Sequence, residues 1–287
     1  MVRIGGLFFA LLISIVSASA QTQFPSDSRL KSIIDQKTIR IAYRTDATPF
    51  AFANDQKQAA GFSVDLCQLV TKSIARQFGL EDLAIQWVPV TVQTRFSAVS
   101  GNQADLECGS STITLGRMKE VDFSNIIFVE STGVVVARSA NMQSFADMAG
   151  KKIAVISGTT NERAVTDQTK LHNLNLTIIA VKSGEEGIAA LEAGKVDGYA
   201  SDKLLLIGGH MKNPDNYMML PDDLSIESYG IALPRGDWAL RLAVNTGLAE
   251  VYRSGMIAGV FKKWFDQLGL QPGVLNRAAY ALGGLSD

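Results

Sequence analysis

The chain has 287 residues, enough to bury one large hydrophobic core or two smaller ones. Its 27 basic and 28 acidic residues give a formal net charge of −1, which argues against a nucleic-acid-binding protein, because such proteins carry a basic surface. With 47% hydrophobic residues and no long block of like charge, the composition is that of an ordinary globular α/β protein.

The first twenty residues predict a cleaved signal peptide. Arg3 supplies a positive charge, residues 7–16 form an apolar stretch, and residues 18–20 (A-S-A) offer a cleavage site of small residues. The apolar stretch is short for a membrane span of about 20 residues, although an uncleaved anchor is the alternative. We expect an exported chain that starts at Gln21.

Short β-branched runs then alternate with helical stretches, which is typical of parallel sheets covered by helices. We expect, in chain order, a helix at 29–36, strand 38–43, a helix from Gly61 to Gly79, strand 83–88, helix 94–100, strand 105–108 and helix 115–121. Phe50 and Phe52, in the loop after the first strand, look exposed.

A second unit repeats this alternation. We expect strand 151–156, helix 161–170, strand 176–181, helix 184–193, strand 196–200 and helix 203–210. Residues 99–105 and 191–197 both run from a helix through a left-handed stop to an aspartate that opens a strand. This similarity indicates two lobes of like architecture; chance similarity between helix–strand joints is the alternative.

Two extended segments, 126–138 and 226–234, link the units, so we expect the first lobe to be discontinuous. The tail after them reads as two helices, 237–254 and 259–268. Their aromatic residues are expected in the core rather than in a ligand site: Tyr252, Phe261, Trp264 and Phe265.

Residues 105–117, D-L-E-C-G-S-S-T-I-T-L-G-R, place a hydroxyl cluster five residues before an arginine. Guanidinium and hydroxyl donors together suit a carboxylate. A second hydroxyl-rich turn, S-G-T-T at 157–160, lies in the second unit. The two turns predict a cleft that closes on a small anion.

Cys67 and Cys108 are the only cysteines, and in an oxidising compartment they can pair; two buried thiols are the alternative. Two cysteines and two scattered histidines lack zinc-ligand spacing, so we expect no metal site, and we expect no cofactor.

Several motifs in combination resemble a known family. They are G-F-S-V-D-L at 61–66, residues 105–117, D-F-S at 122–124, S-G-T-T at 157–160, Asp202, and E-S-Y-G-I at 227–231. Across nearly the whole mature chain, the sequence resembles periplasmic amino-acid-binding proteins of ABC importers, the family 3 solute-binding proteins. The resemblance is greatest to their glutamate/aspartate-binding members.

The resemblance implies an α/β fold of the two-lobe periplasmic-binding-protein class (type II, Venus-flytrap) with two hinge strands. Lobe 1 would comprise residues 21–130 and 234–287, and lobe 2 residues 131–233. It also implies a periplasmic monomer that closes on an amino acid and delivers it to a membrane permease and its ATPase, without enzymatic activity or nucleic-acid binding.

The same resemblance assigns roles to residues. Arg117, helped by Ser110 and Thr112, would hold the α-carboxylate of the ligand. Thr159 and Thr160 would donate to that ligand from a helix N-terminus.

Asp202 would accept from the ammonium group, and an N-cap of the helix at 203–210 is the structural alternative for it. Arg44 and Arg95 would hold a side-chain carboxylate, and two solvated surface arginines are the alternative.

The chain departs from the glutamate/aspartate-binding members at two places. Val92 stands where they have a serine, and the loop 182–184 lacks a histidine that some of them have. These changes leave the choice among glutamate, aspartate and their amides open.

Two rival functions remain at this point. One is an enzyme that resembles cyclohexadienyl dehydratase, with Glu107 or Glu162 as its general acid. The other is a sensor that reports the ligand to a receptor partner.

Overall fold

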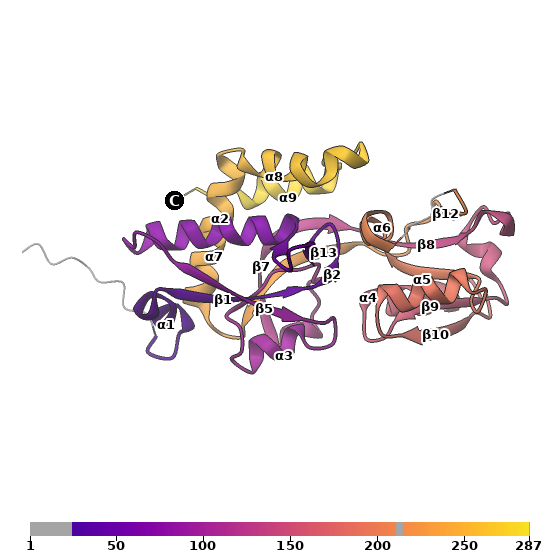
Figure 1. Cartoon of the computed structure of the whole chain (residues 1–287), viewed down its shortest axis with the longest axis horizontal. Coiled ribbons are helices and arrows are strands. Elements are labelled where there is room, and N and C mark those ends of the chain that lie inside the picture. Colours follow the sequence, from indigo (N-terminus) through magenta and orange to yellow (C-terminus); the bar gives the residue numbers. More distant parts are fainter. Residues whose placement is uncertain (1–24, 211–214, 287) are drawn as a thin grey trace, which may run out of the picture.

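The computed structural model describes residues 25–210 and 215–286 as two α/β units that lie end to end along the long axis (Figure 1). The expected signal peptide, residues 1–20, lies outside the described residues. Each unit has a five-stranded sheet, and a small sheet of β2 (Asp46–Ala47), β3 (Ala51–Ala53) and β4 (Ala59–Ala60) adjoins the first. None of the described helices is both long and apolar enough to cross a membrane.

The first sheet has the strand order β5-β1-β6-β13-β7, with β1 parallel to β5 and β6, and β13 antiparallel to β6 and β7. Its strands are β1 (Thr38–Arg44), β5 (Ala84–Val90), β6 (Leu106–Glu107), β7 (Val121–Glu130) and β13 (Glu227–Pro234). Helices α1 (Arg29–Gln36), α2 (Phe62–Gln77) and α3 (Arg95–Ser100) contribute buried side chains to its cores.

The expectation of a helix at 115–121 is wrong. A short 3₁₀ turn, Arg117–Lys119, leads directly into β7, which begins at Val121. Val121 and Phe123 are buried while Asp122 between them is not, and this alternation is the period of a strand.

The second sheet has the order β10-β9-β11-β8-β12. Its strands are β8 (Thr132–Ala137), β9 (Lys152–Ile156), β10 (Thr177–Val181), β11 (Gly198–Asp202) and β12 (Tyr217–Met219). Ile153 and Val155 of β9 pack with α4 (Thr160–Leu171), while Ala154 and Ile156 pack with α5 (Gly184–Glu192). Because side chains alternate along a strand, the two helices cover opposite faces of this sheet.

The joint between helix and strand is repeated in both units. Asn102 and Gly194 have φ angles of 60° and 65°, and each is followed three residues later by an aspartate. The carboxylates of Asp105 and Asp197 each accept a backbone N–H of the neighbouring strand, β1 or β9, at 2.8 Å. The expected similarity of these two joints is therefore confirmed.

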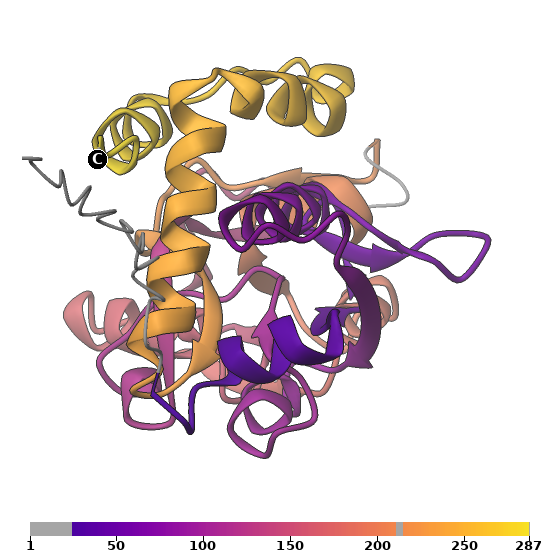
Figure 2. The same cartoon turned by 90° about the vertical axis from the view of Figure 1, so that its left-hand side faces the viewer.

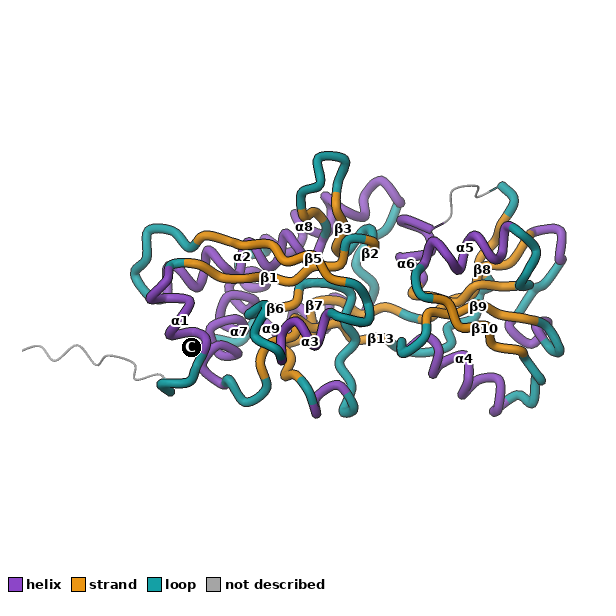
Figure 3. Tube along the Cα trace, turned by 60° about the horizontal axis from the view of Figure 1, so that its bottom comes forward, coloured by secondary structure: helices purple, strands orange, loops and turns teal. Residues whose placement is uncertain are grey.

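The chain crosses between the sheets twice, along segments that Figure 3 shows running from one unit to the other. β7 ends at Glu130 and β8 begins at Thr132, so the first crossing is a single residue, Ser131. All of β13 pairs with β7 from Glu227 onward. This pairing makes residues 227–234 part of the first sheet.

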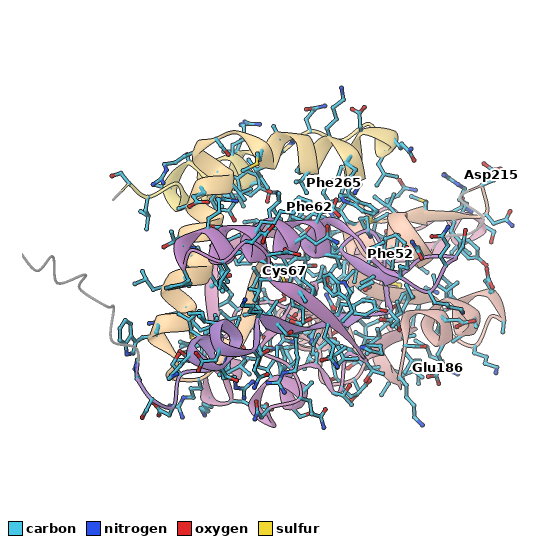
Figure 4. All side chains as sticks on the ribbon, turned by 60° about the vertical axis from the view of Figure 1, so that its left-hand side comes forward. Phe52, Phe62, Cys67, Glu186, Asp215 and Phe265 are labelled. Atoms are coloured by element: carbon cyan, nitrogen blue, oxygen red, sulfur yellow. A yellow bond between two sulfur atoms is a disulfide. The ribbon has the colours of Figure 1, made fainter. Side chains whose placement is uncertain are left out.

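Aromatic rings fill the centre of the first unit. The Phe50 ring centroid lies 4.9 Å from that of Phe128 and 5.1 Å from that of Tyr229. Phe62 of α2 and Phe265 meet at 5.3 Å in the same cluster (Figure 4). The expectation that Phe50 is exposed is wrong, because its edge-to-face contacts with these rings bury it completely.

The C-terminal tail has three helices rather than the expected two: α7 (Trp238–Arg253), α8 (Met256–Phe265) and α9 (Val274–Gly283). Figure 2 shows α8 and α9 lying across the end of α7. The side-chain amide of Asn276, in α9, donates to and accepts from the backbone of Val129 at 3.0 and 2.7 Å. This bridge ties α9 to the edge strand β7, close to the first crossing.

Candidate functional site

A small pocket, with a cavity volume of about 10 Å³, lies between the two units. Its lining includes the last residues of three strands, Arg44 of β1, Ile156 of β9 and Asp202 of β11. The carboxyl ends of strands are where open α/β sheets bind ligands. All eight residues expected at the site line this pocket: Arg44, Arg95, Ser110, Thr112, Arg117, Thr159, Thr160 and Asp202.

Three arginines reach the pocket from the first unit. Arg44 ends β1, Arg95 begins α3, and Arg117 begins the turn before β7. Arg44 and Arg95 are each 3% exposed, so the alternative of solvated surface arginines is wrong for both. Guanidinium groups buried to this extent need anionic or hydrogen-bonding partners.

The protein supplies only part of those partners. Arg44 Nε donates to Asp46 at 2.9 Å, and Arg117 Nη1 donates to the carbonyl oxygen of Thr112 at 2.8 Å. Within the described chain, Arg44 Nη2 and Arg95 Nε are buried without a hydrogen-bond partner. Leaving a buried donor unpaired costs about 1–3 kcal/mol, so these N–H groups favour an acceptor inside the pocket.

The charges of the arginines also favour an anion. Burial, together with the nearby positive charge of Arg117, lowers the pKa of Arg95 to about 9. Both guanidinium groups flank the ring of Phe96, with their carbons 4.8 and 5.1 Å from its centroid. The ring stabilises both cations, and an anion bound between them would relieve their mutual repulsion.

The loop after β6 presents a further donor. Cys108 in this loop forms a disulfide with Cys67 of α2, and Ser63 Oγ donates to the carbonyl oxygen of Gly109 at 2.8 Å. The buried hydroxyl of Ser110, which lines the pocket, has no partner among the described residues. The loop is therefore anchored to α2 on one side while it offers a hydroxyl to the pocket on the other.

Thr112 lies where the two units touch. Its hydroxyl donates to Glu227 at 2.6 Å and lies 3.3 Å from the hydroxyl of Thr160. A threonine hydroxyl has one proton, so Thr160 must be the donor in the second pair. In this geometry the hydroxyl proton of Thr112 is used within the protein, and its oxygen is left as an acceptor.

Helix α4 begins at the opposite wall of the pocket. The Thr159 hydroxyl caps this helix, accepting from the N–H of Glu162 at 3.2 Å and donating to the carbonyl of Ile156 at 2.7 Å. Its side chain is therefore used within the protein. What Thr159 and Thr160 offer an anion is their backbone N–H groups at the positive end of the helix dipole.

Asp202 is the acidic residue of the pocket lining, and it is 5% exposed. Its carboxylate accepts from the hydroxyl of Tyr229 at 2.5 Å and from Asn161 Nδ2 at 2.7 Å. Burial, together with the nearby charge of Glu227, raises the pKa of Asp202 to about 6.

The helix after Asp202 is shorter than expected. α6 (Lys203–Leu205) is followed by a π-helical segment, Leu206–His210. The Asp202 side chain makes no capping hydrogen bond to α6. Asp202 does occupy the N-cap position of α6, but both of its carboxylate oxygens are held by residues of other elements.

Comparison with known proteins agrees with this architecture. The model of the bacterial extracellular solute-binding proteins, family 3, matches residues 39–267. The chain belongs to this family. It is similar to the L-glutamate/L-aspartate-binding protein of Pseudomonas aeruginosa, with 32% identity over 241 residues, 83% of this chain and 80% of that protein.

Two further similarities extend the comparison. The glutamate/aspartate import solute-binding protein of Escherichia coli is 29% identical over 259 residues, which is 89% of this chain and 86% of that protein. The crystal structure of an ancestral amino acid-binding protein, a precursor of cyclohexadienyl dehydratase, has a TM-score of 0.72 at 25% identity, covering 83% of this chain and 100% of its own. The expected two-lobe α/β fold is thereby confirmed.

In this solute-binding protein, the two carboxylates considered as general acids are not part of the pocket lining. Glu107 is fully buried and accepts from Ser111 at 2.6 Å. Burial raises the pKa of Glu107, against the attraction of Arg95. Glu162 accepts the backbone N–H of Gly158 at 2.8 Å and so belongs to the cap of α4.

Three residues of the solute-binding protein's site were not assigned a role from the sequence. Asn161 lines the pocket, and Glu227 and Tyr229 bond directly to pocket residues. Glu227 and Tyr229 lie in the motif E-S-Y-G-I, but nothing local in that motif indicates their partners. An acidic residue at the start of the hinge strand was the available signal for Glu227.

Proposed function

We propose that this protein is the extracytoplasmic substrate-binding component of an ABC amino-acid importer, and that it binds an acidic amino acid, glutamate or aspartate, between its two lobes. It acts in the periplasm as a monomer and delivers the ligand to a membrane permease and its ATPase. The names of the Pseudomonas and E. coli relatives support the ligand class, and the word import in the latter supports the transport role.

One observation carries the ligand class. The pocket lining contains three guanidinium groups and one carboxylate, and buried donors on Arg44, Arg95 and Ser110 are unpaired within the described chain. An acidic amino acid supplies two carboxylates and one ammonium group, which matches this arrangement. A ligand with a cationic side chain would instead meet like charge.

The geometry supports a division of the ligand's three charges. Arg117, Ser110 and the N-terminus of α4 hold the α-carboxylate, with the fork of Arg117 as the anchor. Arg44 and Arg95 hold the side-chain carboxylate. Asp202 and the acceptor oxygen of Thr112 receive the ammonium group.

Val92 lines the pocket and adds a methyl surface rather than a hydroxyl. This removes one polar contact that a serine would supply to the ligand's side chain. The three arginines still set the preference for an anionic side chain, so we expect glutamate and aspartate to bind more tightly than glutamine and asparagine.

The two lobes move as units in the proposed mechanism. By strand pairing, lobe 1 comprises residues 25–130 and 227–286, and lobe 2 lies between them. Ligand bridges Arg117 on lobe 1 and α4 on lobe 2, and so shifts the population toward the closed form. The contact between Thr112 and Thr160 at 3.3 Å supports a closed arrangement of this structure.

Calorimetric titration with single amino acids tests the proposed function. We expect saturable one-to-one binding of L-glutamate and L-aspartate, with L-arginine and L-lysine at least tenfold weaker because of the pocket's arginines. A parallel thermal-shift screen should show stabilisation of about 4 kcal/mol at a thousandfold excess of ligand over Kd. Selective stabilisation by L-arginine or L-lysine would contradict the proposal.

Affinity for L-glutamate is expected to rise with pH through about 6. Burial raises the pKa of Asp202 to about 6, so Asp202 is protonated below that pH and cannot accept fully from an ammonium group. Below the pKa, the affinity should fall up to about tenfold per pH unit. Titrations between pH 5.5 and 7.5, where the ligand's carboxylates stay ionised, measure this effect.

Asp202→Asn is the matched control for this titration. It should bind more weakly and show a flat profile over the same range, because it lacks the titrating carboxyl. An equal pH dependence in Asp202→Asn and the unaltered protein would assign the effect to another group.

A further inference from the structure

Glu227 is a buried carboxylate at the hinge that does not itself line the pocket. It is the first residue of β13 and is 2% exposed. Its Oε2 accepts from Thr112 at 2.6 Å, and its Oε1 accepts from Ser225 at 2.6 Å and from Thr132 at 3.4 Å. Three hydroxyl groups from three segments therefore surround one carboxylate, and Ser225 Oγ also lies 2.8 Å from Thr132 Oγ1.

The same network reaches Asp202 through the second lobe. Asn161 Nδ2 donates one proton to Thr132 at 2.8 Å and the other to Asp202 at 2.7 Å. Asn161 therefore links the hydroxyl groups around Glu227 to Asp202. In this chain of contacts, Thr112 and Ser225 donate toward Glu227, whereas Asn161 and Tyr229 donate toward Asp202. The network thus fixes which atoms around the pocket's acidic end donate and which accept.

The network determines which hydrogen bonds Thr112 can offer to a ligand. The Thr112 hydroxyl donates its single proton to Glu227. The oxygen of Thr112, which accepts from Thr160, then offers the pocket only its remaining lone pair. A ligand ammonium group can donate to it, whereas a ligand carboxylate or hydroxyl-free carbon gains nothing from it.

We propose that Glu227 is a positioning residue that orients Thr112 as an acceptor and thereby makes the site prefer amino acids over their deaminated analogues. The proposal rests on the proposed function, since it needs an acidic amino acid in the pocket. It extends that function by assigning the discrimination of the ammonium group to a residue outside the pocket lining.

The test compares L-glutamate with glutarate, which has both carboxylates and lacks the ammonium group. Calorimetry at pH 7.5 gives the ratio of the two dissociation constants. Glu227→Gln places an amide N–H or an amide oxygen opposite Thr112 and frees the hydroxyl to reorient. We expect the glutarate-to-glutamate ratio to fall by about 10- to 100-fold, the range for a hydrogen bond to a charged group.

Glu130→Gln is the matched control. Glu130 is the cross-strand partner of Glu227 in β7 and lies outside the pocket lining. Burial raises the pKa of Glu130 to about 8, so its carboxyl is largely neutral at pH 7.5 and glutamine resembles it. Glu130→Gln should leave the ratio unchanged.

A double-mutant cycle separates positioning from long-range charge. Thr112→Val removes the acceptor and should lower the ratio as Glu227→Gln does. In the Thr112→Val background, Glu227→Gln should then cause no further fall. Full additivity of the two changes would show that Glu227 acts on the ammonium group by charge alone, and would overturn the proposal.

The remaining outcomes are also informative. If Glu227→Gln does not fold, as judged by its thermal melt, Thr112→Val must lower the ratio and Thr112→Ser must keep it, or the inference is wrong. If the unaltered protein binds glutamate and Glu227→Gln keeps its ratio, the inference fails while the proposed function survives. If the unaltered protein binds neither compound, the proposed function itself fails.

Discussion

Arg117→Ala is expected to weaken the binding of L-glutamate by roughly 30-fold to several thousand-fold, which corresponds to about 2–5 kcal/mol. Arg117 holds its guanidinium group in place through Thr112, over the ring of Phe96. The alanine leaves the ligand's α-carboxylate with the helix α4 N-terminus and Ser110 but without the fork of parallel N–H donors. Isothermal titration calorimetry measures the change.

The control is Arg76→Ala. The Arg76 side chain is 62% exposed and pairs with Glu250, so its loss removes one positive charge without touching the pocket. Its Kd should stay within about twofold of the unaltered protein, since exposed ion pairs contribute little. Unchanged affinity in Arg117→Ala would show that the α-carboxylate lies elsewhere.

Much of the fold follows from local patterns in the sequence. The alternation of strands and helices, and the turns at Asn102 and Gly194, depend on residues close in the sequence and on backbone conformations that asparagine and glycine favour. The arginines could be placed at the pocket because Arg44 ends a strand, and strand ends gather at one edge of a parallel sheet.

The direction of the hydrogen bonds could not be read in this way. Thr112 and Glu227 are 115 residues apart in the chain, and Tyr229 reaches Asp202 from a different sheet. Only the folded arrangement shows that the hydroxyl of Thr112 donates its hydrogen bond to Glu227. Sequence motifs identify the residue types of a site, whereas the donor and acceptor roles depend on partners that are distant in sequence.

The burial of Phe50 could not be read from the sequence either. Phe50 follows Pro49 in a loop, which favours an exposed interpretation, yet the ring is enclosed by β7, β13, α2 and α8. Helix α9 was missed, and it is held by the bonds of Asn276 to the distant Val129 and by the packing of Tyr280 on Tyr252.

Replacing both cysteines with alanine is expected to lower the free energy of unfolding by about 4 kcal/mol. Cys67 and Cys108 are separated by 41 positions in the sequence, and opening a loop of that size gives the unfolded chain the corresponding entropy. The melting temperature should fall by roughly 10 °C for a chain of this length. Thermal and urea unfolding of the ligand-free protein measure the change.

The affinity for L-glutamate should change much less than the stability, because the disulfide acts mainly on the unfolded state while Ser63 still holds the carbonyl of Gly109. A reducing agent provides the control: it should destabilise the unaltered protein and leave Cys67→Ala/Cys108→Ala unaffected. If the reducing agent shifts both melting curves equally, its effect is unrelated to the disulfide. If the double variant melts with the oxidised protein, the covalent link adds no stability, and packing alone holds the Ser110 loop against α2.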